Sequence, residues 1–423
     1  MTQTARLIDD AHARAADPFA GRGPEPSARS LAATRIALTN FRSYARSDLR
    51  TAAAPVVLAG ANGTGKTNLL EAISLLSPGR GLRGAKLAAI QRKGPADRDA
   101  AIKDGARKDA LADSLWAVSA TVSRPDGEWE IGTGLLPANS NAAPPRRTLH
   151  LNGAPAQSAD LAELVPMLWL TPAMDRLFLE GASERRRFLD RLVFALDPAH
   201  AKRAARYERA MHERLRLLRD GVRDPVWLDG LEESMGADGA ALTSARLSVI
   251  ENLNAELAER GAEGAFPCAH LALRDGSSDQ TGDGASDPIR LQAALRDFRT
   301  RDADSGRTHA GPHLADLEVR HTLKRADARD CSTGEQKALL ISIVLANAWL
   351  QKKRHAGIAP LLLLDEIAAH LDSNRRAALF EEILELECQA WLTGTDRSLF
   401  AALNERAAFF AIEAGQFVQR ERA

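Results

Sequence analysis

The chain has 423 residues. A single hydrophobic core usually supports fewer residues than this, so we expect a large core and a second lobe. Its 56 Lys and Arg residues balance 56 Asp and Glu residues, so no overall charge draws it to nucleic acid or anionic lipid, and any DNA contact must come from a local patch. The three cysteines are widely separated, which argues against a disulfide framework or a structural zinc site. The sequence has no secretory signal and no apolar run close to the roughly 20 residues of a membrane span. We therefore predict a cytoplasmic protein without a membrane segment.

The first part of the chain predicts an extension followed by a mixed sheet. Residues 1–30 combine Ala, Pro, Gly and charges without periodicity, and we expect them to be flexible. A strand begins at Leu31, and a buried strand at 55–59 leads directly into a helix at 66–76. Further alternating segments, which predict an antiparallel sheet layered on this unit, lie at 115–122, 129–135 and 147–151.

The second part predicts a helical lobe and then a return to strands. Residues 183–260 have helical periodicity almost throughout, with a break near 220–225. A long helix is expected at 333–354, and the Asp, Ser and Gly content of 275–288 indicates an exposed loop. The remaining expected strands lie at 270–273, 314–321 and 360–364 and near Trp391 and Phe409.

A glycine-rich segment fits the phosphate-loop pattern GxxxxGK[ST] between a predicted strand and a predicted helix. It consists of Gly60, Ala61, Asn62, Gly63, Thr64, Gly65, Lys66 and Thr67. Glycines let backbone amides approach phosphates, and the helix N-terminus adds positive potential. We therefore predict an ATP site in which Lys66 reaches the β and γ phosphates and Thr67 binds Mg²⁺. A turn that matches by chance is the other interpretation, and the flanking elements disfavour it.

Two acidic residues follow the apolar strand LLLL at 361–364. Asp365 and Glu366 are thereby expected at the C-terminal edge of a parallel sheet, where ligands bind in this class of fold. We expect Asp365 to hold Mg²⁺ and Glu366, together with Lys66, to be catalytic, with Glu366 orienting or deprotonating the attacking water. Acidic strand ends also occur as solvated termini. Their combination with the phosphate loop favours the catalytic interpretation.

A capping sequence opens the helix expected at 333–354. This signature segment consists of Ser332, Thr333, Gly334, Glu335 and Gln336. Ser332 or Thr333 can cap the helix and leave backbone amides that attract an anion. Ordinary caps of this composition are frequent. Its position one helix before LLLLDE, downstream of a phosphate loop, resembles the motif order of ABC-type ATPases. That resemblance implies a homodimer in which the signature of one subunit contacts the γ-phosphate held by the other subunit.

Several segments together resemble the RecF family of bacterial DNA replication and repair proteins, which belongs to the ABC-type, SMC-like group of ATPases. The resemblance runs from about Leu31 to the C-terminus and rests on NFRSY at 40–44, GANGTGKTNLLEAI at 60–73, GASERRRFLDR at 181–191, GPH at 311–313 and STGEQKALL at 332–340. Two departures stand out. Leu314 and Ala315 follow GPH where the resemblance leads us to expect Arg and Asp. The segment 393–396 lacks the switch histidine of ABC transporters, so no γ-phosphate sensor is assigned. His313 is expected to be a packing or capping residue.

The resemblance implies an α/β fold: an ABC-type ATPase head, with a phosphate-loop sheet and an antiparallel β layer, plus a mainly helical second lobe. The predicted divisions are 31–182 and 266–423 for the head and 183–265 for the lobe. It also assigns Arg42 to nucleotide binding and Asp372 to the D-loop. The implied activity is a weak, DNA-stimulated ATPase that dimerises on ATP and binds double-stranded and gapped DNA at single/double-strand junctions. With RecO and RecR it would help to load RecA and support the SOS response.

A helix predicted at 201–219 has a basic face that could contact DNA. Lys202, Arg206, Arg209 and Arg216 lie on this face, and Tyr207, Met211, Leu215 and Leu218 lie opposite. The alternative is a solvated face paired with Glu208 and Glu213. Arg185 and Arg186 are also candidate DNA contacts, although the helix that carries them packs through Phe188 and Leu189. The absence of an aromatic ladder favours recognition of the DNA backbone.

Other classes of protein share the motif order. The nucleotide-binding subunit of an ABC transporter is one alternative, and the long insertion between the phosphate loop and the signature and the missing switch histidine argue against it. An SMC-like structural ATPase is another, but the insertion is too short for its coiled coil and no heptads are sustained. A fused nuclease is weaker still, because no additional carboxylate or histidine cluster for two metals is visible.

Overall fold

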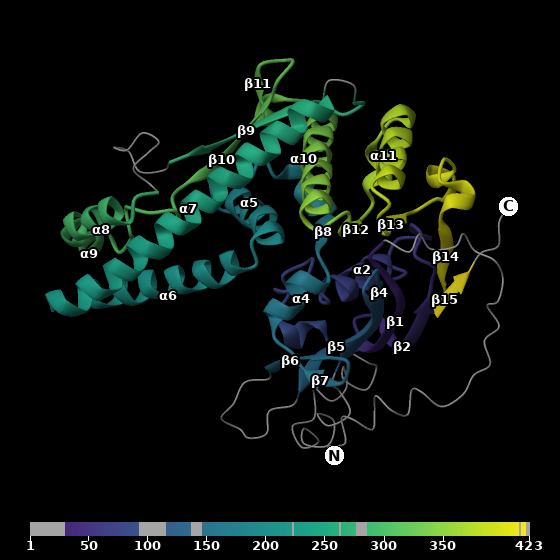
Figure 1. Ribbon diagram of the computed structural model, residues 1–423, viewed down its shortest axis with the longest axis horizontal. Coiled ribbons are helices and arrows are strands. Elements are labelled where there is room, and N and C mark those ends of the chain that lie inside the picture. The colour runs from purple at the N-terminus through teal and green to yellow at the C-terminus, as the bar shows by residue number, and fades with distance from the viewer. Residues whose placement is uncertain are drawn as a thin grey trace. The chain divides into compact units, whose positions relative to one another are not determined.

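The computed structural model describes residues 30–92, 116–136, 146–221, 224–261, 264–275, 286–413 and 416–419. These residues form two compact units (Figure 1). The first unit comprises the described residues within 1–169, 358–369 and 383–423, and the second comprises those within 170–357 and 370–382. Apart from Ser30, the predicted N-terminal extension lies outside the described residues, as does most of the predicted loop at 275–288.

An antiparallel sheet forms one layer of the first unit. Its strand order is β2-β1-β4-β5-β6-β7. The strands are β1 (Ala32–Phe41), β2 (Tyr44–Arg50), β4 (Ala117–Arg124), β5 (Gly127–Leu136), β6 (Arg146–Leu151) and β7 (Ala154–Pro155). Apolar residues alternate with polar ones in β4, where Val118, Ala120 and Val122 are buried. This alternation places one face of the sheet on the core and leaves the other polar.

A second sheet, of order β15-β14-β3-β13-β12-β8, contains the parallel strands that position the site. Its members are β3 (Val56–Ala59), β8 (Met167–Leu170), β12 (Leu361–Leu364), β13 (Ala390–Gly394), β14 (Ala408–Glu413) and β15 (Gln416–Gln419). Neighbouring strands among β14, β3, β13 and β12 are parallel, and all four leucines of β12 are buried, as expected for a strand covered on both faces. The C-terminal ends of β3, β12 and β13 therefore meet at one edge.

Short helices complete the first unit. They are α2 (Lys66–Ser74), α4 (Ser158–Leu164), η2 (Leu87–Ile90), η6 (Arg397–Phe400) and η7 (Asn404–Arg406). Helix α2 ends two residues earlier than predicted, because the amides of Leu75 and Leu76 bond to the carbonyls of Ala72 and Ile73, three residues back, which tightens the last turn. A further short helix, η5 (Ile367–His370), follows β12.

The second unit is mainly helical. Its helices are η3 (Pro172–Arg176), α5 (Ala182–Leu196), α6 (Ala199–Arg219), α7 (Pro225–Gly261), α8 (Pro288–Asp297), α9 (Arg299–Ser305), η4 (Ala328–Asp330), α10 (Thr333–Arg354) and, as far as Glu382, α11 (Ser373–Glu385). A small sheet of order β11-β10-β9 contains β9 (Ala269–Arg274), β10 (Asp316–His321) and β11 (Ala326–Asp327). Helices α8 and α9 lie near one end of α7, and the small sheet lies near the other (Figure 1).

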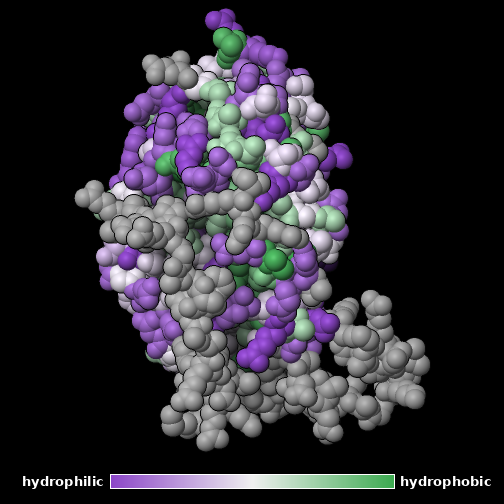
Figure 2. Space-filling model, turned by 90° about the vertical axis from the view of Figure 1, so that its right-hand side faces the viewer, coloured by the Kyte–Doolittle hydropathy of each residue, from purple (hydrophilic) through white to green (hydrophobic). Residues whose placement is uncertain are grey.

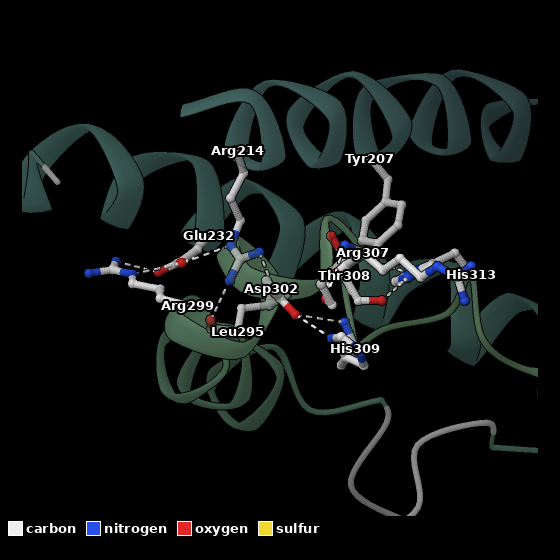
Figure 3. A network of polar contacts seen from close by, with 11 residues as sticks. Tyr207, Arg214, Glu232, Leu295, Arg299, Asp302, Arg307, Thr308, His309 and His313 are labelled. Carbon is white, nitrogen blue, oxygen red and sulfur yellow. Dashed lines mark hydrogen bonds and ion pairs between the residues drawn. The ribbon is translucent and has the colours of Figure 1, made fainter. Parts of the chain in front are cut away.

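A buried ionic network ties α6, α7 and the α8–α9 segment together (Figure 3). Arg214 is fully buried and donates from Nε to Glu232 Oε1 at 2.9 Å and from Nη1 to Asp302 Oδ2 at 2.6 Å. Its third branch donates to the carbonyl of Leu295. Both carboxylates are also buried, so each guanidinium donor replaces a hydrogen bond that water would otherwise make. Arg299 and His309 extend the network.

Most of the predicted elements are confirmed. Helix α10 has the predicted bounds, and the helical stretch at 183–260 is α5, α6 and α7. Strand β10 begins at Asp316 rather than Leu314, because the Leu314 amide closes a turn on the carbonyl of Gly311. The two compact units divide the chain differently from the predicted lobes, since 266–357 groups with the helices of the second unit. The functional division into lobes remains a prediction.

The burial of α6 differs from its predicted pattern. The buried residues are His200, Tyr207, Ala210, Arg214 and Leu217. The buried stripe thus includes an arginine, and Leu215 and Leu218 are only partly buried. Among the residues coloured by hydropathy in Figure 2, hydrophilic ones predominate and hydrophobic ones gather in small patches. Within the described ranges, none of the helices combines the length and hydrophobicity that a membrane span requires.

Candidate functional site

The phosphate loop runs from the end of β3 to the start of α2. Its first amide, that of Gly60, donates to the carbonyl of Gly394 at the end of β13 at 3.2 Å, which fixes the loop to the neighbouring strand. Ala61, Asn62 and Gly63 are exposed, whereas Lys66 is buried. Lys66 Nζ donates to the carbonyls of Gly60 at 2.6 Å and Ala61 at 2.9 Å. Burial lowers the pKa of this ammonium, and the charges of Glu366 and Asp365 oppose the shift.

Two motifs that lie 298 residues apart in the sequence meet through Thr67 and Asp365. The Thr67 hydroxyl donates to Asp365 Oδ1 at 2.9 Å and lies 3.0 Å from Oδ2. Asp365 is buried at the end of β12, and Thr67 lies in the first turn of α2. A hydroxyl and a carboxylate at this spacing are hard oxygen donors of the kind that Mg²⁺ prefers. The described geometry therefore fits the predicted metal pair.

Thr393 joins the two acidic residues, and sequence reasoning did not identify it. Its hydroxyl donates to Asp365 Oδ1 at 2.7 Å and accepts the Glu366 amide at 2.8 Å. Thr393 is fully buried on β13, so these bonds have no competition from water. Its only sequence signal is its place in the segment 393–396, which lacks a switch histidine.

Replacing Thr393 by Val should lower the free energy of unfolding of the first unit by about 1–3 kcal/mol. The reason is that the buried Glu366 amide loses its acceptor and Asp365 loses a donor, and buried unsatisfied groups cost about this much. Thr393→Ser keeps the hydroxyl and serves as the matched control. Urea unfolding measures both variants, and equal losses in Ser and Val would show that the methyl group, not the hydroxyl, matters.

Glu366 has a backbone conformation that non-glycine residues rarely adopt. Its φ is 51°, in the left-handed region, and its half-buried carboxylate makes no hydrogen bond or ion pair with any residue for which the structure gives a position. Strained backbone of this kind occurs where surrounding contacts hold it, as the Thr393 bond does here. The carboxylate is thus left available at the strand edge.

Gly65, the last glycine of the phosphate loop, has a conformation and a close packing that favour glycine. Its φ of 112° suits glycine alone, and a Cβ there would lie 2.8 Å from Ser43 Oγ and 2.9 Å from Tyr44 Oη. Tyr44 in turn donates its hydroxyl to the Gly65 carbonyl at 3.0 Å and is fully buried. The NFRSY segment therefore shapes the start of α2.

Gly65→Ala should be more destabilising than Gly63→Ala. Gly63 also has a positive φ, 82°, but a Cβ at that position would meet no atom within 4 Å. Backbone strain costs about 1–3 kcal/mol at either position, and overpacking adds a similar amount only at Gly65. Thermal unfolding of the two variants provides the comparison. Equal shifts in melting temperature would mean that the contact with Ser43 and Tyr44 is readily relieved.

Arg42, the other predicted nucleotide contact, is bonded to the helix that follows the loop. It makes two bonds to the buried Glu71, from Nε at 2.9 Å and from Nη2 at 2.6 Å, and a third from Nη1 to the Ala89 carbonyl at 2.7 Å. Arg83 also pairs with Glu71 at 3.0 Å. All three branches of Arg42 are engaged, so its nucleotide role stays a prediction, and its described role is to brace α2.

The signature forms the predicted cap in the second unit. Ser332 is the N-cap of α10, and its hydroxyl accepts the Glu335 amide while Glu335 accepts the Ser332 amide. Ser332, Thr333 and Gly334 are exposed, whereas Gln336 is buried and donates to the Cys331 carbonyl. Hydrogen bonds lower the pKa of Glu335 to about 2, and the bond from Lys324 contributes more than those from Ser332. The Glu335 carboxylate is therefore ionised at neutral pH, and its charge is paired with that of Lys324.

The remaining candidates also lie in the second unit. Asp372 caps α11, where its carboxylate accepts the Arg375 amide at 2.9 Å. His313 bonds to Tyr207 Oη and to the Thr308 carbonyl, both at 2.9 Å, and burial lowers its pKa, which agrees with the expected packing role. No described contact joins either residue to the phosphate loop.

Some of the six candidate DNA contacts form ion pairs or hydrogen bonds within their own chain, and others do not. Arg185 pairs with Asp316 at 2.7 Å, and Arg186 donates to the Ala315 carbonyl at 2.7 Å. Arg206 pairs with Asp238 and Arg216 with Glu213. Lys202 and Arg209 are exposed and make no ion pair among the described residues. The solvated alternative thus holds for part of the face, and a role in DNA binding stays a prediction.

Comparisons with known proteins identify relatives of this chain. The model of the RecF/RecN/SMC N-terminal domain matches residues 32–416. The DNA replication and repair protein RecF of Agrobacterium fabrum is 48% identical over 384 residues, covering 90% of this chain and 97% of the relative. The RecF of Mesorhizobium japonicum is 46% identical over 388 residues, covering 90% of this chain and 96% of that protein.

The fold agrees with these relatives. A solved structure of the recombination mediator protein RecF-ATP in the RecFOR pathway aligns with a TM-score of 0.76 at 22% identity, over 93% of this chain and 98% of that one. At this identity the likeness shows the fold. Family membership is shown by the identity of nearly one half across nine tenths of the sequence and by the match to the family model. The chain belongs to the RecF family of DNA replication and repair proteins, whose ATPase head has the ABC-type fold described above.

Proposed function

We propose that this protein is an ATP-driven switch that closes as a dimer on DNA. The observation that carries the proposal is the contact between Thr67 and Asp365, because it joins the phosphate loop to the strand-end acidic pair at one edge of a parallel sheet. Backbone amides of residues 60–65 bind the phosphates of ATP. Lys66 releases its two loop carbonyls and turns to the β and γ phosphates.

Mg²⁺ fits the same edge. Thr67 and Asp365 would hold it, and Thr393 keeps the Asp365 carboxylate oriented through its 2.7 Å bond. When bound there, Mg²⁺ would neutralise charge on the β and γ phosphates. The chain's own contribution is to fix these two oxygen donors before ATP arrives.

Hydrolysis is assigned to Glu366. Its half-buried carboxylate makes no hydrogen bond or ion pair among the described residues, follows the metal ligand Asp365 in sequence and projects from a backbone held by Thr393. It can accept a proton from the attacking water or orient that water toward the γ-phosphate. A slow turnover is expected, because the site is complete only after dimerisation.

The signature acts on the partner copy. Ser332, Thr333 and Gly334 are exposed at the N-terminus of a 22-residue helix, where backbone amides and the helix dipole favour an anion. In the closed dimer they contact the γ-phosphate bound by the other copy, and Asp372 lies in the D-loop of the same interface. Two composite sites result, as two-fold symmetry requires.

DNA binding at gaps and single/double-strand junctions follows from closure. Lys202 and Arg209 supply unpaired positive charge for phosphates, and Arg206 and Arg216, which pair with Asp238 and Glu213, lie on the same helix. Membership of the RecF family supports cooperation with RecO and RecR in loading RecA and in the SOS response. The transporter and SMC-like alternatives are not favoured, because the curated relatives that match nine tenths of the chain are RecF proteins.

Sedimentation velocity tests this proposal. The native chain should double in mass with ATP and Mg²⁺, more readily with gapped DNA, while Lys66→Ala and Ser332→Arg remain monomeric. Lys66→Ala removes the phosphate contact, and Ser332→Arg blocks the capped helix end without touching the phosphate loop. An unchanged native mass with ATP and DNA present would mean that no composite site forms.

A further inference from the structure

The turn of the β10–β11 hairpin, residues 322–325, is joined to the signature by Glu335. Lys324 Nζ forms an ion pair with Glu335 Oε1. The other oxygen, Oε2, accepts the Ser332 amide at 3.1 Å and the Ser332 hydroxyl at 3.0 Å. The turn and the exposed signature residues therefore form one surface, and whatever covers Ser332 also meets the turn.

This turn presents an apolar side chain and a cation without a partner. Leu323 is 89% exposed, more than any other large apolar residue in the described part of the chain. Arg325 is exposed, and its guanidinium makes no ion pair or hydrogen bond with any residue that the structure describes. The two nearby arginines, Arg320 and Arg329, both have Asp327 within 4.0 Å.

Arg325 also holds a backbone conformation that is unfavourable for a side chain. Its φ is 53°, and its amide closes the turn on the Thr322 carbonyl at 3.3 Å. Glycine or asparagine would relieve such a conformation. A strained position, an unpaired cation and an exposed leucine thus occur together in a turn that contacts the exposed signature segment.

We propose that this turn is a second element acting on the partner copy of the dimer. In the ATP-closed state, Leu323 is buried against the partner beside its phosphate loop, and Arg325 directs positive charge toward the triphosphate bound there. The molecule that binds the turn is a second copy of this chain, because the turn continues the surface of Ser332, Thr333 and Gly334. A triphosphate bound to that copy also supplies the negatively charged partner that Arg325 lacks in its own chain. The inference rests on the proposed function, namely that the signature meets the phosphate loop of another copy.

Two substitutions test it, Leu323→Asp and Arg325→Glu. With a non-hydrolysable ATP analogue, each should raise the protein concentration needed for half dimerisation at least tenfold in sedimentation experiments. Binding of a fluorescent ATP analogue to the monomer should stay native, because the phosphate loop is untouched. Arg325→Lys should keep most of the affinity. Ile289→Asp is the matched control, since Ile289 is 76% exposed on α8, which Figure 1 places at the opposite end of α7.

The outcomes separate this inference from the proposed function. If Ser332→Arg abolishes dimerisation while both turn variants dimerise like the native chain, the turn is not part of the interface and the inference is wrong. If Ser332→Arg also dimerises normally, the proposed composite site itself fails. Native dimerisation combined with weakened binding of gapped DNA would make the turn a DNA contact and would equally overturn the inference.

Discussion

Glu366→Gln should reduce the rate of ATP hydrolysis by about 10²–10⁴-fold, the usual contribution of a general base or a water-orienting carboxylate. Gln is nearly the same size and cannot accept the proton. The half-buried Glu366 side chain makes no described hydrogen bond or ion pair that the change would break, and the hydrogen bond from its backbone amide to the Thr393 hydroxyl at 2.8 Å is retained. ATP binding and ATP-dependent dimerisation should therefore persist, and the closed dimer should become long-lived.

Phosphate release under single-turnover conditions measures the rate, and sedimentation measures the dimer. Glu405→Gln is the control, because Glu405 is an exposed carboxylate of the same unit. A Glu366→Gln rate within a few-fold of the native rate would remove the residue from the chemistry. A collapse of ATP binding would instead assign it a structural role at the loop.

Arg214→Met should lower the free energy of unfolding of the second unit by about 3–5 kcal/mol. The substitution removes a fully buried guanidinium and leaves the carboxylates of Glu232 and Asp302 in a site with no exposure. Arg299 still pairs with Glu232, and His309 with Asp302, but neither replaces the bridge that joins the two carboxylates (Figure 3).

Urea unfolding followed by circular dichroism gives the comparison with Arg209→Met. Arg209 lies on the same helix and is exposed, so its loss should change stability by no more than about 0.5 kcal/mol. Similar values for the two variants would mean that the buried network contributes nothing that an apolar side chain cannot supply.

The sequence predicted the parts of the site that depend on local order. A strand, a glycine-rich loop and a helix are consecutive at 56–74, so the phosphate loop could be placed without knowing any distant contact. The same holds for Ser332 and Glu335, because a capping box spans one helical turn. The acidic pair at 365–366 could be placed at a sheet edge because four consecutive leucines indicate a strand buried on both faces.

The residues that sequence reasoning missed depend on pairing between distant segments. Thr393 reaches Asp365 only because β13 lies beside β12 in a register that pairs Leu364 with Leu392. Arg214 lies in a helix with many charged residues, so its sequence context predicts exposure to solvent. Its burial depends on Glu232 from α7 and Asp302 from α9. Periodicity carries no information about either pairing, because each partner comes from another element.

The most direct test of a composite site is complementation between two inactive variants. Lys66→Ala disables the phosphate loop, and Ser332→Arg disables the signature, so either chain alone should neither close nor hydrolyse ATP at the native rate. In a mixed dimer, one of the two sites combines the intact phosphate loop of the Ser332→Arg chain with the intact signature of the Lys66→Ala chain. Mixing the two proteins should therefore restore ATP hydrolysis and an ATP-dependent dimer, and a mixture as inactive as its components would contradict catalysis shared between two copies.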